Sequence, residues 1–116
     1  MTIKVVIQQT DLPVPASSVL VTGIVAQPGG QVAATPLTGR ENVVENVVPG
    51  AGVALQVLPF WPSVKVFNQS GTGQALDVYP PVGMNIQGQA LNVPVPVADQ
   101  GVATFTWNGA GTWLVS

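Results

Sequence analysis

Few residues of this 116-residue chain could do chemistry. It has no histidine and no cysteine, which excludes Ser/His/Asp and Cys/His triads, disulfide bonds, and imidazole or thiolate metal sites. Two carboxylates, Glu41 and Glu45, are spaced to share one face of a strand or a helix. A glycosidase also needs substrate-shaped surroundings and one acid that stays protonated. We therefore interpret the pair as surface or inter-subunit hydrogen-bonding groups, and we predict no enzyme activity, no metal and no cofactor.

The other chemical features of the sequence favour structural roles. Asp77 alternates with Leu76 and Val78, so its side chain is expected to point away from theirs. Asp99 lies where a turn favours aspartate. The glycine-containing segment at residues 71–73 lacks the following helix that would direct N–H groups at a phosphate.

Charge is scarce along the whole chain. It has three basic and five acidic residues, against roughly 29 charged residues expected for a domain of this length. Three basic residues are too few to neutralise a phosphate backbone, so no nucleic-acid partner is predicted. Uncharged polar residues could form the surface by themselves. Alternatively, other subunits cover much of it, since a small net charge favours association.

No segment of the sequence suggests a membrane partner. No apolar run approaches the roughly 20 residues that a membrane-spanning helix needs. The N-terminal residues 1–4 lack the apolar core of a signal peptide. We expect a soluble protein with no membrane partner.

The composition favours β-structure, because valine is the commonest residue, with 22 copies. Residues 40–48 could also be drawn as a helix, but four valines and two asparagines favour a strand. Alternating patterns and turn residues predict strands at 2–9, 17–27, 40–48, 53–58, 63–69, 75–79, 84–86, 90–97, 102–107 and 112–115. This spacing predicts one all-β domain over residues 1–116, a small antiparallel β-sandwich or jelly-roll-like fold. Residues 1–30 would provide an extended N-terminal arm or an inter-subunit strand.

Two pairs of strands look like hairpins. Residues 63–69 and 75–79 are joined by a short glycine-containing break, which predicts a hairpin. Residues 102–107 and 112–115 flank Asn108-Gly109, the strongest hairpin signal in the chain. Ala103, Phe105 and Trp107 would share one face.

The segment 17–27 is apolar on both faces. Val19, Val21 and Val25 share one face, and three further apolar residues share the other. Such a strand is expected to be buried on both faces. In a chain this small, a neighbouring subunit could provide the second cover, so these three valines are candidate interface residues.

Pro94 and Pro96 lie two residues apart in the segment 90–97. Alternate N–H groups of a strand point to the same side, so both prolines remove donors from one side. This predicts an edge strand. The prolines could simply prevent edge-to-edge aggregation, or the edge could lie against another subunit, which makes them candidate interface residues.

The aromatic residues could stack on sugars, but in a small domain most are expected in the core. Phe60 and Trp61 differ, because Pro59 and Pro62 flank them. They are candidate anchors for a partner, since tryptophan is enriched at interface hot spots.

Several turn and core motifs lie in the C-terminal half: a strand ending at Asn68, then Leu76-Asp77-Val78-Tyr79-Pro80, Gly83-Met84-Asn85-Ile86-Gln87-Gly88, Ala103-Thr104-Phe105 and Trp113. Residues 35–38 and 47–53 add similar motifs upstream. Together they resemble small β-rich structural proteins of tailed-bacteriophage virions. The first thirty residues match no pattern of these proteins.

The resemblance implies a capsid decoration (cement) or minor head protein on the virion surface, forming a homotrimer and binding the major capsid protein. Low charge, the doubly apolar segment and proline-containing arms are compatible with this expectation. The alternative is a tail, neck or fibre-base component, or a host-receptor-binding module.

Overall fold

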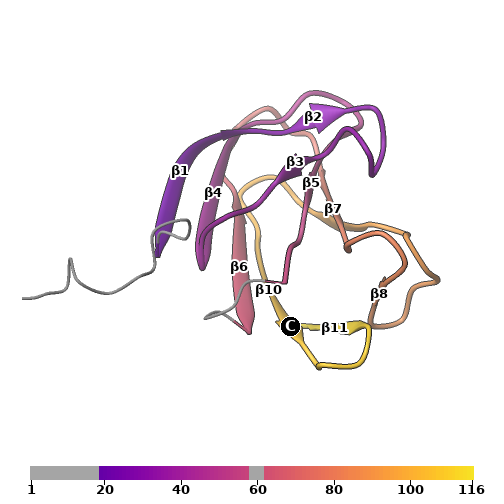
Figure 1. The fold of residues 1–116 in the computed structure, drawn as a ribbon. Helices are drawn as coiled ribbons and strands as arrows, with labels where there is room; N and C mark the ends of the chain where they lie inside the picture. The colour runs from indigo at the N-terminus through magenta and orange to yellow at the C-terminus, as the bar shows by residue number, and fades with distance from the viewer. Residues whose placement is uncertain (1–18, 58–61) are drawn as a thin grey trace, which may run out of the picture.

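The computed structural model describes residues 19–57 and 62–116, and these residues contain strands but no helix (Figure 1). The prediction of an all-β fold is confirmed. The strands are β1 Leu20–Val25, β2 Gln27–Pro28, β3 Thr35–Pro36, β4 Glu41–Asn46, β5 Ala51–Ala54, β6 Ser63–Asn68, β7 Leu76–Tyr79, β8 Asn85–Ile86, β9 Val95–Val97, β10 Val102–Trp107 and β11 Thr112–Val115. Residues 40–48 contain strand β4, as their composition favoured.

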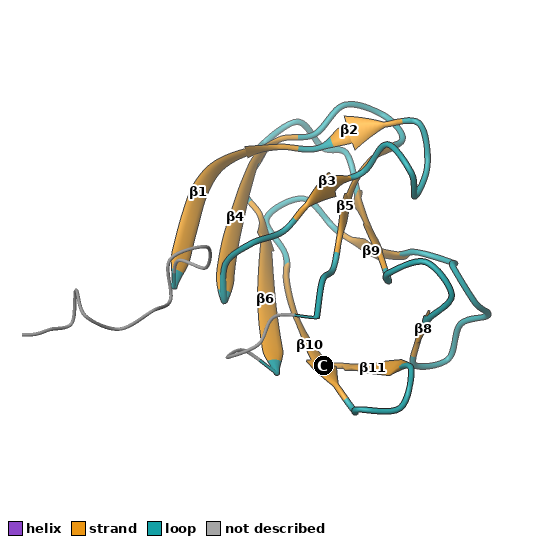
Figure 2. Ribbon diagram, in the orientation of Figure 1, coloured by secondary structure: helices purple, strands orange, loops and turns teal. Residues whose placement is uncertain are grey.

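The strands form two sheets (Figure 2). The six-stranded sheet has the order β1-β4-β6-β10-β11-β8. The five-stranded sheet has the order β2-β5-β7-β9, and β3 pairs with the parallel strand β5. Consecutive segments from β4 to β10 alternate between the sheets, so the chain winds around the core instead of completing one sheet first.

The winding is solenoid-like from β4 to β7. β4 pairs in parallel with β6 in one sheet, and β5 pairs in parallel with β7 in the other. One turn of the coil therefore stacks on the next, rather than connecting as in a jelly roll. Five of the nine strand pairs in the described residues are parallel, so the expected antiparallel pairing holds for only four.

One predicted hairpin is confirmed and the other is wrong. β10 and β11 pair antiparallel, with Trp107 opposite Trp113 and their ring centroids 5.5 Å apart. β6 and β7 instead belong to different sheets, so residues 63–69 and 75–79 form no hairpin. The glycine-containing segment between them carries the chain across the core, because Gly71 and Gly73 both have positive φ angles.

The core lies between the two sheets and draws apolar residues from both. In β6, Val64 and Val66 are fully buried, whereas the alternating positions face outward. The hairpin β10–β11 contributes Phe105 and Trp113, which are fully buried. The other described aromatic residues, Phe67, Tyr79 and Trp107, are only half-buried, so fewer aromatic residues are core residues than we expected. The cluster is completed by Ala26, Leu37, Val44, Val47, Ala51, Val53, Leu55, Leu76, Val78, Ile86 and Val97.

Candidate binding surface on the six-stranded sheet

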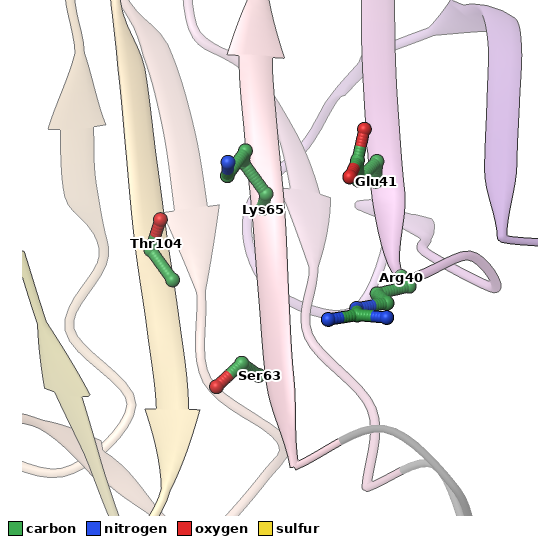
Figure 3. A pocket seen from close by; sticks show the side chains of 5 residues that line it. All are labelled: Arg40, Glu41, Ser63, Lys65 and Thr104. Atoms are coloured by element: carbon green, nitrogen blue, oxygen red, sulfur yellow. The ribbon is translucent and has the colours of Figure 1, made fainter.

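The outer face of the six-stranded sheet carries a row of polar residues. Glu41 of β4, Lys65 of β6 and Thr104 of β10 are register partners across three neighbouring strands. With Arg40 and Ser63 they line an open hollow of about 250 Å³. Figure 3 shows the five side chains, which come from β4 and the residue before it, from β6 and from β10.

A buried asparagine holds the main chain beside this hollow. Asn42 follows Glu41 and points inward, with no exposed surface. Its side-chain amide donates to the main-chain oxygens of Gly39 at 2.8 Å and of Lys65 at 3.2 Å. Its side-chain oxygen accepts the Gly39 N–H at 3.1 Å. Because these bonds are shielded from water, they fix the residues before β4 against β6.

The hollow concentrates positive charge. Arg40 and Lys65 are the two cationic side chains within residues 19–57 and 62–116, and both line it. Glu41 adds one carboxylate to the same lining. The Lys65 Nζ also lies 6.0 Å from the centroid of the Phe67 ring. This arrangement can bind carboxylate or polar groups of a partner.

The carboxylates of Glu41 and Glu45, which are close in sequence, do not both line the hollow. Glu45 is not among its lining residues. The Glu45 carboxylate instead accepts the N–H of Gly23, on the neighbouring strand β1, at 3.0 Å. Glu45 therefore forms a hydrogen bond within the chain, whereas we expected the pair to serve as surface or inter-subunit groups.

An apolar band runs beside the hollow on the same face. Val43, Phe67 and Val102 are register partners across β4, β6 and β10. Val102 is 54% exposed, and the other two are half-buried. We call these three residues the apolar band. A face that combines an apolar band with a few charges has the composition of a protein–protein contact.

The three candidate valines of segment 17–27 lie at or beside strand β1. Val19 and Val25 are 52% and 46% exposed, and Val21 is half-buried. The described residues therefore do not bury both faces of this segment. The reason is the position of the strand, because among residues 19–57 and 62–116 β1 is the end strand of its sheet and pairs with β4 alone.

The remaining candidates divide between described and undescribed residues. Pro96 is exposed on β9 and Pro94 is half-buried just before it. β9 is the end strand of the five-stranded sheet, so the predicted edge is confirmed. Phe60 and Trp61 lie outside the described residues, as does most of the segment 1–30, up to residue 18.

Sequence reasoning missed the hollow and a clamp around Asp99. The Asp99 carboxylate accepts N–H groups from Gly73 and Gly71, each at 2.9 Å, and contacts Ser70 Oγ at 3.3 Å. The Gly73 N–H contributes most to holding the pKa of Asp99 below its usual value. Elsewhere, burial raises the pKa of Tyr79, and the nearby Asp77 adds to the effect. The sequence signalled the two parts of the clamp separately, as a turn at Asp99 and a glycine-containing break at residues 71–73, but not that they meet.

Comparisons with protein-family models, curated protein sequences and solved structures found no match for the chain. Within the part of the chain that the structure describes, no group of three or more carboxylate side chains could hold a metal ion. No helix long and apolar enough to cross a membrane occurs in that part either.

Proposed function

We propose that the protein is a non-enzymatic structural subunit of a phage virion: a decoration (cement) protein that forms a homotrimer and binds the major capsid protein at the capsid surface. One observation carries the proposal: the outer face of the six-stranded sheet presents an apolar band and an exposed apolar end strand. The scarcity of charge in the whole chain supports the proposal, because an apolar surface with few charges favours association with other subunits.

Buried area, not chemistry, would be the mechanism. A standard interface buries about 800 Å² on each partner. The apolar band supplies the centre of such a contact, since apolar burial yields roughly 25 cal/mol per Å². Because a decoration subunit is present in many copies, even a modest contact per copy would reinforce a capsid against the pressure of the packaged DNA.

The hollow beside the band would give the contact its orientation. Arg40 and Lys65 offer donors to carboxylates on a capsid partner, and Glu41 disfavours a second carboxylate at its own position. Charged groups at the rim of an interface mainly set partner choice and the rate of association. Binding to capsids should therefore weaken modestly as the salt concentration rises.

The decisive experiment is to label the protein and image virions, together with a count of its copies per virion. Hundreds of copies over the head support decoration, whereas about a dozen copies at the tail would refute it. In parallel, Val102→Lys should reduce binding to capsids that lack the protein. Val32→Lys is the matched control, since Val32 is an exposed valine in the loop between β2 and β3.

A tail-associated or receptor-binding role is the second candidate, and an apolar loop cluster favours it. Val32, Val82 and Leu91 are exposed on three loops. The side-chain amide of Gln31 ties these loops together, donating to Pro80 O at 2.7 Å and Asn92 Oδ1 at 3.3 Å. In this role Val32→Lys would abolish binding to the tail or receptor partner, and Val102→Lys would not. The same two variants therefore distinguish the candidates.

A further inference from the structure

The tip of the β10–β11 hairpin, residues 108–111, places an exposed asparagine directly before an exposed glycine. In such a pair the main-chain nitrogen of the glycine can attack the side-chain amide of the asparagine, because glycine has no Cβ to hinder its own nitrogen. The chain has six asparagines, and the five others are followed by valine, isoleucine or glutamine. Asn108 is therefore the one asparagine of the chain with an unhindered neighbour.

The nucleophile of this pair would be the Gly109 nitrogen. Within residues 19–57 and 62–116, its N–H forms no hydrogen bond. Gly109 has a φ of 82°, and a Cβ built on it would meet nothing within 4 Å. The Gly109 nitrogen is therefore open to water, which can take its proton, and the surrounding space lets the peptide plane turn toward the Asn108 side chain.

The electrophile would be Cγ of Asn108. Its Oδ1 accepts the Ala110 N–H at 2.7 Å and the Thr112 N–H at 3.1 Å, so the amide group is bent over the turn. Two donors at these distances polarise the carbonyl and stabilise the negative charge that the oxygen takes when Cγ is attacked. The amide nitrogen of Asn108 has no partner among the described residues, so none of them retains it as a leaving group.

We propose that Asn108 is a self-modification site that converts to aspartate or isoaspartate. A bond forms between the Gly109 nitrogen and Asn108 Cγ, and the bond from Cγ to the amide nitrogen breaks. That nitrogen leaves as ammonia and carries away the proton of the Gly109 N–H. Water then opens the five-membered succinimide, at Cγ to give aspartate or at the main-chain carbon to give isoaspartate. The reaction needs no partner, so the inference is independent of the proposed function.

The two products should affect the hairpin differently. A carboxylate of aspartate accepts the Ala110 and Thr112 N–H groups more strongly than the amide does, so the turn should persist. Isoaspartate adds one carbon to the main chain within the turn, which should disturb the pairing of Trp107 with Trp113. Either product adds one negative charge to a chain whose formal net charge is −2.

The test is to incubate the purified full chain at neutral and mildly alkaline pH and to locate mass changes by tandem mass spectrometry. Residue 108 should become heavier by about 1 Da, because –OH replaces –NH₂. The change should be faster at higher pH, since the Gly109 nitrogen attacks after losing its proton. Asn46 and Asn92 are internal controls, because both are exposed and each precedes a valine. Neither should change over the same time.

Two alanine variants separate the attacking nitrogen from the shape of the turn. Gly109→Ala places a methyl group beside that nitrogen and should slow the reaction roughly tenfold, a barrier higher by about 1.4 kcal/mol. Gly111→Ala is the matched control. Gly111 also has a positive φ, and a Cβ on it would likewise meet nothing within 4 Å, so the backbone strain is similar. This variant should react within about twofold of the wild type.

An isoaspartyl methyltransferase gives a second readout, because it labels the isoaspartate product and not aspartate. The incubated wild type should accept the label, and Asn108→Asp should not. An unchanged mass at residue 108 would overturn the proposal, as would equal mass gains at Asn46 or Asn92. Equal slowing by Gly109→Ala and Gly111→Ala would overturn it as well, because the turn and not the Gly109 nitrogen would then control the reaction.

Discussion

The side-chain amide of Asn68 donates to the main-chain oxygen of Val97 at 3.0 Å, and this bond joins β6 of one sheet to β9 of the other. The same amide donates to the Gln74 oxygen at 3.0 Å, and its oxygen accepts from Ser70 Oγ at 3.0 Å. Asn68 has no exposed surface. One buried side chain therefore connects both sheets with the segment that crosses between them.

Asn68→Ala should destabilise the fold strongly. The substitution leaves buried main-chain oxygens without donors, at about 1–3 kcal/mol each, so the free energy of unfolding should fall by roughly 3 kcal/mol. Urea unfolding at pH 7 would measure it. Asn46→Ala, at an exposed asparagine of β4, should change the same free energy by less than about 0.5 kcal/mol. Equal effects at the two positions would contradict the proposed role of Asn68.

The clamp around Asp99 should make stability depend on acid pH. The pKa of Asp99 is lowered in the folded protein, chiefly by the Gly73 N–H and also by the Gly71 N–H. The stabilisation is therefore complete above the ordinary pKa of aspartate, about 3.9, and is lost as the pH falls through the lower pKa of the folded state. Urea midpoints of the wild type should drop below pH 4.

Asp99→Asn provides the comparison for that pH dependence. It removes the charge but keeps one acceptor oxygen, so it should be less stable than the wild type at pH 7 and similar to it at the lowest pH. A constant difference between the two proteins across this range would show that Asp99 does not titrate with folding.

Trp113 combines complete burial with an unsatisfied donor. Its Nε1 finds no acceptor among the described residues, although the ring is fully buried against Trp107. Trp113→Phe removes the donor, whose burial costs about 1–3 kcal/mol, and this gain should offset much of the lost packing. We expect a change within about 1 kcal/mol, against about 3–5 kcal/mol for Trp113→Ala. Guanidinium unfolding of both variants would check it, and a large loss in Trp113→Phe would contradict it.

The prolines of β9 should protect that edge from aggregation. Pro96 lies opposite Asp77, and the residues before and after Pro96 also pair with β7. The position at which Pro96 lacks an N–H therefore faces solvent rather than β7. Replacing Pro94 and Pro96 together with threonine would restore outward donors. Static light scattering should then show faster aggregation at equal protein concentration, whereas Pro49→Thr, in an exposed turn, should not. Unchanged scattering would mean that the side chains, not the prolines, protect β9.

The sequence predicted those features that depend on local physics. Strand positions and the inward side of β6 and β10 follow from alternation, which needs only neighbouring residues. The β9 edge follows from the covalent structure of proline. The β10–β11 hairpin follows from Asn108, whose side-chain oxygen accepts the Ala110 N–H at 2.7 Å and the Thr112 N–H at 3.1 Å.

The features that the sequence did not predict depend on residues far apart. Whether the chain returns from Asn68 into the same sheet or crosses to the other depends partly on Asp99, which holds the turn at Gly71 and Gly73. The hollow depends on parallel register between Glu41 and Lys65, which no local pattern encodes. The apolar pattern of β1 predicted that both of its faces would be buried, but not whether the same chain or another subunit buries them.

The parallel coil from β4 to β7 has a consequence for how the protein folds. Glu41 and Lys65 lie 24 positions apart in sequence, and Gly52 and Asp77 lie 25 apart. Each parallel contact can form only after the segment that crosses between the sheets has been ordered. The chain therefore loses the loop-closure entropy before it gains the pairing energy. Folding should therefore take milliseconds to seconds, as in other proteins dominated by distant contacts. The β10–β11 hairpin, whose partners are close in sequence, can form first, so the earliest structure should appear at the C-terminal end of the chain.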